Sequence, residues 1–192
     1  MMRSILVGIL VLMAAGVGWL TIDWYQARSS GQPFGAPFAL VDQKDQPITE
    51  AAFRGHPTAV FFGFTHCPEV CPTTLFELDG WLKKLGDDGK DIRAYFVSID
   101  PERDTPAAMD TYVSNVSNRI TGITGDPDKV AAMAKSFGIY ARKVPLDGGD
   151  YTMDHTASVL LLDGKGDFFG TIAYGESGDT AVAKLKRLAG KG

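Results

Sequence analysis

The feature that most constrains this fold is a continuous apolar run over Thr58–Phe64, which reads TAVFFGF. The run shows no alternation of polar and apolar residues, so it predicts a strand that is buried on both faces. Such a strand needs helices packed against both sides of its sheet. The run therefore predicts the central strand of an α/β domain.

The flanking segments carry the signals of the other elements. Strands are predicted at 38–41, 48–49, 93–99, 157–162 and 167–172, the first two as an N-terminal hairpin and the last two joined by a turn at 163–166. One helix is predicted to end at Gly86. Two more are predicted to begin at Pro106 and at Asp126-Pro127, and a last helix contains Val182–Leu188. Periodicity alone supports an α/β class. The order, a parallel half, an inserted helix and an antiparallel half, is typical of a thioredoxin-like fold.

An uncharged segment precedes this domain. Ser4–Ile22 contains no Asp, Glu, Lys or Arg, and as a helix it would rise about 28 Å, close to the thickness of a hydrocarbon core. Arg3 precedes it and Asp23 follows it, which favours an amino end in the cytoplasm. The segment predicts one N-terminal transmembrane helix. A cleaved signal peptide is the alternative, because Ala14-Ala15-Gly16 offers small residues.

The sequence thus divides into an anchor at 1–25, a linker at 26–36 that is rich in Gly, Ser, Gln and Pro, and a domain at 37–192. We expect a single-pass protein of the bacterial inner membrane with its domain in the periplasm, or of the mitochondrial inner membrane in a eukaryote. The periplasm is oxidising, so paired cysteines can form a disulfide there.

Composition excludes two classes of protein. Lys and Arg number 19 against 23 Asp and Glu, for a net charge of −4, so the chain lacks the basic surface of a nucleic-acid-binding protein. Two cysteines are too few for a scaffold held by several disulfides.

The two cysteines directly follow the buried strand, in the segment FTHCPEVCPTT. Proline follows both Cys67 and Cys71, and a residue before proline is disfavoured inside a regular helix. We therefore expect Pro72 as the first helical residue and Cys71 as the cap. Both sulfurs would face the amino end of the helix, whose partial positive charge favours thiolate. The alternative is a structural disulfide, which would close only a small loop and stabilise little.

His155 lies directly before the strand that opens the final hairpin. In a thioredoxin-like arrangement the loop that carries it faces the cysteine turn. Two thiolates and one imidazole form a soft donor set that suits copper, as Cu(I) or Cu(II). Zinc also accepts these donors, although structural zinc normally has four ligands. Asp154 is either a partner that orients the imidazole or a plain loop aspartate.

The remaining donors are weaker candidates. His66 is a second choice, because successive residues of an extended turn point apart. His56 is expected in a solvated loop. Met153 is a potential soft ligand, whereas helical spacing assigns Met133 to the core.

A second polar segment, DPERDTP at 100–106, is interpreted first as structural. Thr105 or Asp104 would cap the following helix, and Pro106 would take its first position. The acidic residues also suit the helix dipole, and docking of a partner is a further possibility.

These residues resemble the Sco/SenC family of copper-binding assembly factors for cytochrome c oxidase. The similarity covers about residues 36–190, behind the single N-terminal anchor that the family commonly carries. Four segments match in family order: FGFTHCPEVCP at 62–72, DPERDTP at 100–106, TGITG at 121–125 and Asp154-His155.

The resemblance implies a thioredoxin-like fold in which Cys67, Cys71 and His155 coordinate one copper ion. It also implies a partner, the copper-A subunit of the oxidase, to which copper is delivered. The alternative role is reduction of that subunit's cysteines, which would make the protein a thiol–disulfide oxidoreductase. In either role we expect other copper carriers or thiol reductants as partners.

A peroxidase is disfavoured. Val70–Thr74 resembles the peroxiredoxin nucleophile region, but that family places a threonine three residues before its reactive cysteine, where this chain has Pro68. Disulfide exchange stays open. His155 separates it from metal binding, because a metal site needs the imidazole and exchange does not.

Overall fold

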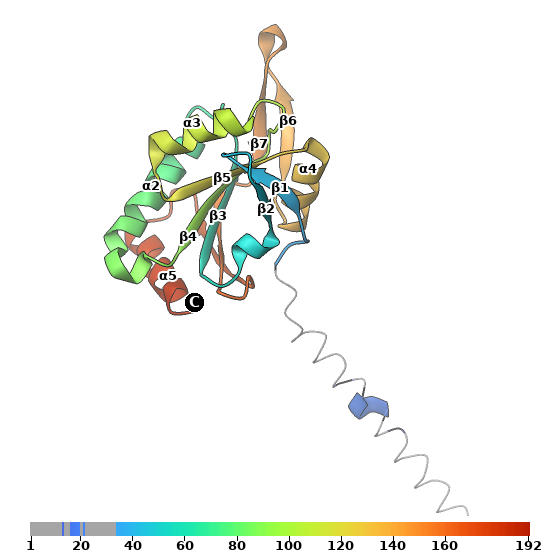
Figure 1. Cartoon of the computed structure of the whole chain (residues 1–192), viewed down its shortest axis with the longest axis vertical. Helices are drawn as coiled ribbons and strands as arrows, with labels where there is room; N and C mark the ends of the chain where they lie inside the picture. Colours follow the sequence, from blue (N-terminus) through green and yellow to red (C-terminus); the bar gives the residue numbers. More distant parts are fainter. Residues whose placement is uncertain (1–12, 14–15, 20, 22–33) are drawn as a thin grey trace, which may run out of the picture. The chain divides into compact units, whose positions relative to one another are not determined.

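The computed structural model describes residues 13, 16–19, 21 and 34–192 (Figure 1). Contacts group the chain into two units, Met1–Gln32 and Pro33–Gly192. Most of the predicted membrane helix at Ser4–Ile22 and most of the predicted linker at 26–36 lie outside the described residues. Among the residues that are described, no helix has the length and apolar character that crossing a membrane requires.

The larger unit is built on a seven-stranded sheet in the order β2-β1-β5-β4-β3-β8-β9. Its strands are β1 (Ala39–Asp42), β2 (Pro47–Thr49), β3 (Thr58–Gly63), β4 (Arg93–Ser98), β5 (Ile120–Thr124), β8 (Ser158–Leu162) and β9 (Phe168–Ala173). A second sheet contains only β6 (Ala141–Pro145) and β7 (Tyr151–His155). The helices are α2 (Val70–Leu85), α3 (Pro106–Val116), α4 (Pro127–Ser136) and α5 (Gly178–Ala189), with short 3-10 turns η1 (Glu50–Phe53), η2 (Gly86–Gly89) and η3 (Asp147–Gly149).

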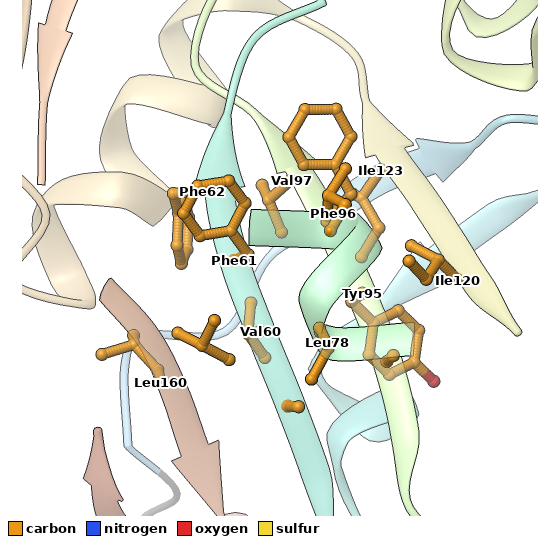
Figure 2. Packing of buried hydrophobic residues seen from close by; sticks show 14 of the residues in the cluster. Val60, Phe61, Phe62, Leu78, Tyr95, Phe96, Val97, Ile120, Ile123 and Leu160 are labelled. Atoms are coloured by element: carbon orange, nitrogen blue, oxygen red, sulfur yellow. The ribbon is translucent and has the colours of Figure 1, made fainter. Parts of the chain in front are cut away.

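The interior position of β3 confirms the prediction, made from the apolar run, of a strand buried on both faces. β3 pairs in parallel with β4 and antiparallel with β8, and all six of its residues are buried. Figure 2 shows Val60, Phe61 and Phe62 of β3 packed among side chains from neighbouring elements, including Leu78 of α2 and Phe96 of β4. The two predicted hairpins, β1–β2 and β8–β9, are also present.

Helices cover the sheet on both sides, as a strand buried on two faces requires. α2 packs against α3 and α5, while α4 contacts β1. Figure 1 shows α4 on the opposite side of the sheet from α2 and α5. This arrangement is the α/β, thioredoxin-like order that the sequence predicts.

Three strands were absent from the prediction. β5 reads ITGIT, in which glycine and threonine interrupt the apolar signal, and it adds a strand between the helices at Pro106 and Pro127. β6 and β7 read ARKVP and YTMDH; β6 is largely exposed and β7 largely half-buried, so no buried face marks them. The prediction that His155 lies in a loop is wrong, because it is the last residue of β7.

The predicted start of the cysteine helix is also wrong by two residues. α2 begins at Val70 with Glu69 as its N-cap, so Cys71 lies inside the first turn instead of capping it. Pro72 then occupies the third helical position. Its missing N–H costs no hydrogen bond there, because the first-turn amides have no partner within the helix. This tolerance outweighs the restriction on the residue before proline.

Two glycines give a matched test of this packing. Gly63 ends β3, and a Cβ added there would stand 2.7 Å from Cys71 Sγ and 2.8 Å from Phe96 Cε2. Gly80 is exposed on α2, and a Cβ there would meet nothing within 4 Å. Gly63→Ala should lower the free energy of unfolding by about 1–3 kcal/mol through overpacking. Gly80→Ala should raise it by about 0.5–1 kcal/mol, because alanine favours the helix.

Urea denaturation of the reduced protein measures both changes. An unaltered midpoint for Gly63→Ala would show that the Cys71 thiol does not lie against the end of β3.

Candidate metal centre

The two cysteines lie where the chain leaves the buried end of β3 and enters α2. Cys67 is half-buried in the connecting turn, where its amide donates to the carbonyl of Phe64 at 3.3 Å. Cys71 is fully buried in the first turn of α2. Both are free thiols. The fold therefore places one accessible and one enclosed sulfur side by side at a helix amino end.

The environment divides the pair into a thiolate and a thiol. A hydrogen bond from the Cys71 side chain is the largest influence that lowers the pKa of Cys67, to about 5, and partial burial opposes it. The amides of Cys71, Glu69 and Val70 lower this pKa further, and the Cys71 amide lies 3.4 Å from Cys67 Sγ. The same side-chain hydrogen bond, together with burial, raises the pKa of Cys71. One proton is thus shared by two sulfurs, with the charge on Cys67.

His155 reaches this pair from the other end of the fold. Its Nε2 lies 3.7 Å from Cys71 Sγ. Its Nδ1 lies 2.9 Å from the carbonyl oxygen of Thr156, which can only accept a hydrogen bond. The proton of a neutral imidazole therefore belongs on Nδ1, and the lone pair of Nε2 faces the sulfur. The rings of Phe61 and Phe64 contact the imidazole at centroid distances of 6.1 and 5.8 Å.

The spacing of Cys71 and His155 fits a shared metal ion. Bonds of about 2.3 Å to sulfur and about 2.0 Å to nitrogen, at a trigonal angle, put the two donor atoms about 3.7 Å apart. Within the described part of the chain, no three His, Cys, Asp or Glu side chains already stand together at metal-binding spacing. The sulfur of Cys67 lies 3.4 Å from the amide nitrogen of Cys71 at the start of α2.

The other predicted donors lie elsewhere. His66 is exposed, with Nδ1 3.1 Å from Thr65 Oγ1 and 3.9 Å from a carboxylate oxygen of Asp104. His56 is half-buried and contacts Thr58, at the end of β3 that is remote from the cysteines.

The methionines and Asp154 make other contacts. Met133 is buried in the core, as predicted, and Met153 packs against the core. Asp154 is exposed and pairs with Arg142 at 3.0 Å. The backbone of Thr156 therefore takes the orienting role that one reading assigned to Asp154.

The polar string at 100–106 contributes more than a helix cap. Thr105 does cap α3, with its hydroxyl accepting from the amide of Ala108. Asp104 is instead fully buried, where it accepts from the Thr65 hydroxyl at 2.6 Å and from the Ser98 hydroxyl at 2.7 Å. Burial raises the pKa of Asp104. The loop at 100–106 is thus hydrogen-bonded to Thr65, which stands two positions before Cys67.

Arg103 and Tyr151 were missed by sequence reasoning. Arg103 Nη1 donates to the carbonyl of Tyr151 at 3.0 Å, and its guanidinium lies 3.8 Å from the centroid of the Tyr151 ring. The two residues are far apart in the chain and belong to no local pattern, so only the motif around Arg103 gave any signal.

Comparison with known proteins agrees with this architecture. The family model described as SCO1/SenC matches residues 26–190. The mouse mitochondrial protein SCO2 homolog is 32% identical over 197 residues, covering 93% of this chain and 76% of that protein. Across eight curated relatives that it matches, the chain spans between 40% and 76% of their length.

Two solved structures are similar in sequence and in fold. Bradyrhizobium japonicum ScoI with copper bound is 45% identical, with a TM-score of 0.74 over 81% of this chain and 99% of that one. Yeast Sco1 with copper bound is 32% identical, with a TM-score of 0.74 over 81% of this chain and 87% of that one. Because the family model matches most of the length of this chain, the chain belongs to the SCO1/SenC family.

Proposed function

We propose that this protein is a copper metallochaperone that binds one copper ion through Cys67, Cys71 and His155. The observation that carries the proposal is the 3.7 Å approach of His155 Nε2 to Cys71 Sγ, beside a second sulfur held as thiolate. Two similar structures contain copper, which supports the choice of metal. Assistance in assembling the copper-A centre of cytochrome c oxidase is carried over from the family resemblance.

The chain's own groups prepare this site for a soft cation. Cys67 supplies a negative charge that is already present at neutral pH, because its pKa is about 5. The Cys71 thiol must lose its proton on binding, so capture of copper releases a proton. Cys67 Sγ then leaves the amide of Cys71 and joins the other two donors. His155 needs no change of tautomer, because its Nε2 lone pair already faces the sulfur.

The second candidate is a thiol–disulfide oxidoreductase, and the unequal pair of thiols supports it. The Cys67 thiolate would attack one sulfur of a partner's disulfide, forming a mixed disulfide and releasing the other partner sulfur as thiolate. The Cys71 sulfur, on losing its proton, would then attack Cys67. The partner leaves as a dithiol, and Cys67 and Cys71 become a disulfide that a thiol reductant must reduce again.

The position of His155 favours the chaperone. Disulfide exchange needs only the two thiols, whereas the imidazole is fixed beside Cys71 by a hydrogen bond to Thr156 and by two aromatic contacts. An imidazole held with its lone pair toward a sulfur is suited to share a metal with it.

Copper titration of the reduced protein tests the donor set. Cys67→Ala and Cys71→Ala should each weaken binding by at least about a hundredfold, because a soft thiolate is lost. His155→Ala should weaken Cu(II) most and retain part of the Cu(I) affinity, since two thiolates suffice for a linear Cu(I) site. His66→Ala is the matched control and should bind copper like the parent. Unchanged Cu(II) affinity in His155→Ala would leave the oxidoreductase as the better reading.

The pH dependence of alkylation tests the charge on Cys67. A thiolate reacts with iodoacetamide and a thiol does not, so the rate should rise through pH 5 and reach a plateau well below the ordinary pKa of 9.0. Cys71→Ala removes the main donor to this thiolate and should move the midpoint upward. The Cys67→Ala protein reports the contribution of the buried thiol. A midpoint near pH 9 in the parent would show that Cys67 is not activated.

We also propose that Ser4–Ile22 is a retained membrane anchor. The full chain should then fractionate with membranes and resist extraction by high salt, because apolar burial is insensitive to ionic strength. A mature protein that begins near residue 17 in the periplasmic fraction would show instead that the segment is a cleaved signal peptide.

A further inference from the structure

The hairpin of β6 and β7 is only weakly integrated into the rest of the fold. Its strands pair with each other and are not part of the seven-stranded sheet. Figure 1 shows this hairpin extending beyond the end of that sheet. Met153 is the apolar hairpin side chain that packs against the described core, and His155 contacts the core rings of Phe61 and Phe64. An open cavity of about 320 Å³ lies where β6 faces α4 and the 99–102 loop. The tilt of the hairpin must therefore be fixed by other contacts.

Arg103 supplies those contacts from the loop between β4 and α3. Its Nε donates to Asp100 at 2.5 Å, and its Nη1 donates to the carbonyl of Tyr151 at 3.0 Å and to Asp150 at 3.2 Å. The Tyr151 ring lies against the guanidinium, and the Tyr151 hydroxyl donates to Asp100 at 2.7 Å. Asp100, Arg103 and Tyr151 thus form a closed set of contacts, which we call the Arg103 clamp. The Arg103 side chain is only 19% exposed, so these interactions are weakly screened.

A neighbouring ion pair reinforces the clamp. Lys143 of β6 lies 2.6 Å from Glu102 and 4.6 Å from the Tyr151 ring centroid, but both charged side chains are about half exposed. Exposed pairs of this kind contribute little. Arg103, whose side chain is largely buried, is therefore the main restraint.

The loop that holds the hairpin also holds the cysteine turn. Asp104, next to Arg103, accepts hydrogen bonds from the hydroxyl and the amide of Thr65. One short segment therefore contacts both the turn that carries Cys67 and the hairpin that carries His155. Relative movement between the two sets of donors is opposed by this segment.

We propose that Arg103 is a positioning residue of the metal centre: through Tyr151 it fixes the tilt of the β6–β7 hairpin and thereby the place of the His155 imidazole beside the cysteine sulfurs. The inference rests on the proposed function, in which His155 is a copper ligand.

The geometry makes the clamp effective. His155 ends β7 where the chain continues to β8, so a tilt of the hairpin about this junction rotates the imidazole. Tyr151 stands four residues away, about 13 Å along the strand. With Nε2 about 4.5 Å from its Cα, 1 Å of play at Tyr151 would tilt the hairpin by about 4° and move Nε2 by only about 0.3 Å. Without the clamp, a tilt of about 15° would move Nε2 by about 1.2 Å, enough to disrupt a metal site.

Two variants test the clamp from its two sides. Arg103→Ala removes the guanidinium. Tyr151→Leu removes the ring and the hydroxyl that the hairpin contributes to the clamp. It leaves the Asp100–Arg103 ion pair intact, so the fold of the loop is preserved. Each variant should lower the Cu(II) affinity of the reduced protein at least about tenfold, because the imidazole loses one of the restraints that hold it in place. Cu(I) affinity should stay within about threefold, since both cysteines remain. In the metal-free protein, NMR cross-relaxation between the rings of His155 and Phe64 should weaken in both variants.

Arg187→Ala is the control, because it removes the same charge from an exposed position on α5. It should leave copper affinity and the ring contacts unchanged. If both clamp variants retain the Cu(II) affinity and the His155–Phe64 contact of the parent, the proposal is wrong. His155→Ala separates this result from failure of the proposed function: if that variant binds Cu(II) like the parent, His155 is no ligand, and the ring contact in the metal-free protein still decides whether Arg103 positions it.

Discussion

The complete burial of β3 is the constraint on which the rest of the structure depends. A strand enclosed on both faces requires helices on both sides, and its parallel partner β4 requires a crossover between them. α2 is that crossover, so its amino end must lie just beyond the last residue of β3. The cysteines occupy this junction. Their exposure to helix amides, and the low pKa of Cys67, are consequences of how the core is closed.

The sequence predicted the parts of the fold that this core controls. The apolar run of β3, the helix that ends at Gly86 and the two outer hairpins all carry strong local patterns. β6 and β7 do not, because neither the largely exposed β6 nor the half-buried β7 has a buried face to produce alternation. The proximity of Cys71 and His155 was predicted from the order of the elements. The contact between Arg103 and Tyr151 was not predicted, since a single cation–ring pair across 48 positions leaves no periodic signal.

The shared proton of the cysteine pair connects the two candidate functions. A thiolate at Cys67 is both the better metal donor and the better nucleophile, so electrostatics alone does not choose between them. The proposed choice between the two functions rests on His155. His155 is oriented by a backbone carbonyl and two aromatic rings, and the hairpin that carries it is held by Arg103. Disulfide exchange needs only the two sulfurs, so under the proposed function these restraints serve metal binding.

The separation of Cys71 and His155 in the chain has a consequence for folding. The two residues are 84 positions apart, and their contact accompanies the pairing of β8, which follows His155, with β3, which precedes Cys67. An unfolded or half-synthesised chain therefore offers two cysteines but no complete set of three donors. An ion bound by all three groups favours the folded state by mass action, by about 2.7 kcal/mol when its free concentration is a hundred times its dissociation constant. Under the proposed function, capture of the ion would stabilise the finished domain and discriminate it from chains that are still incomplete.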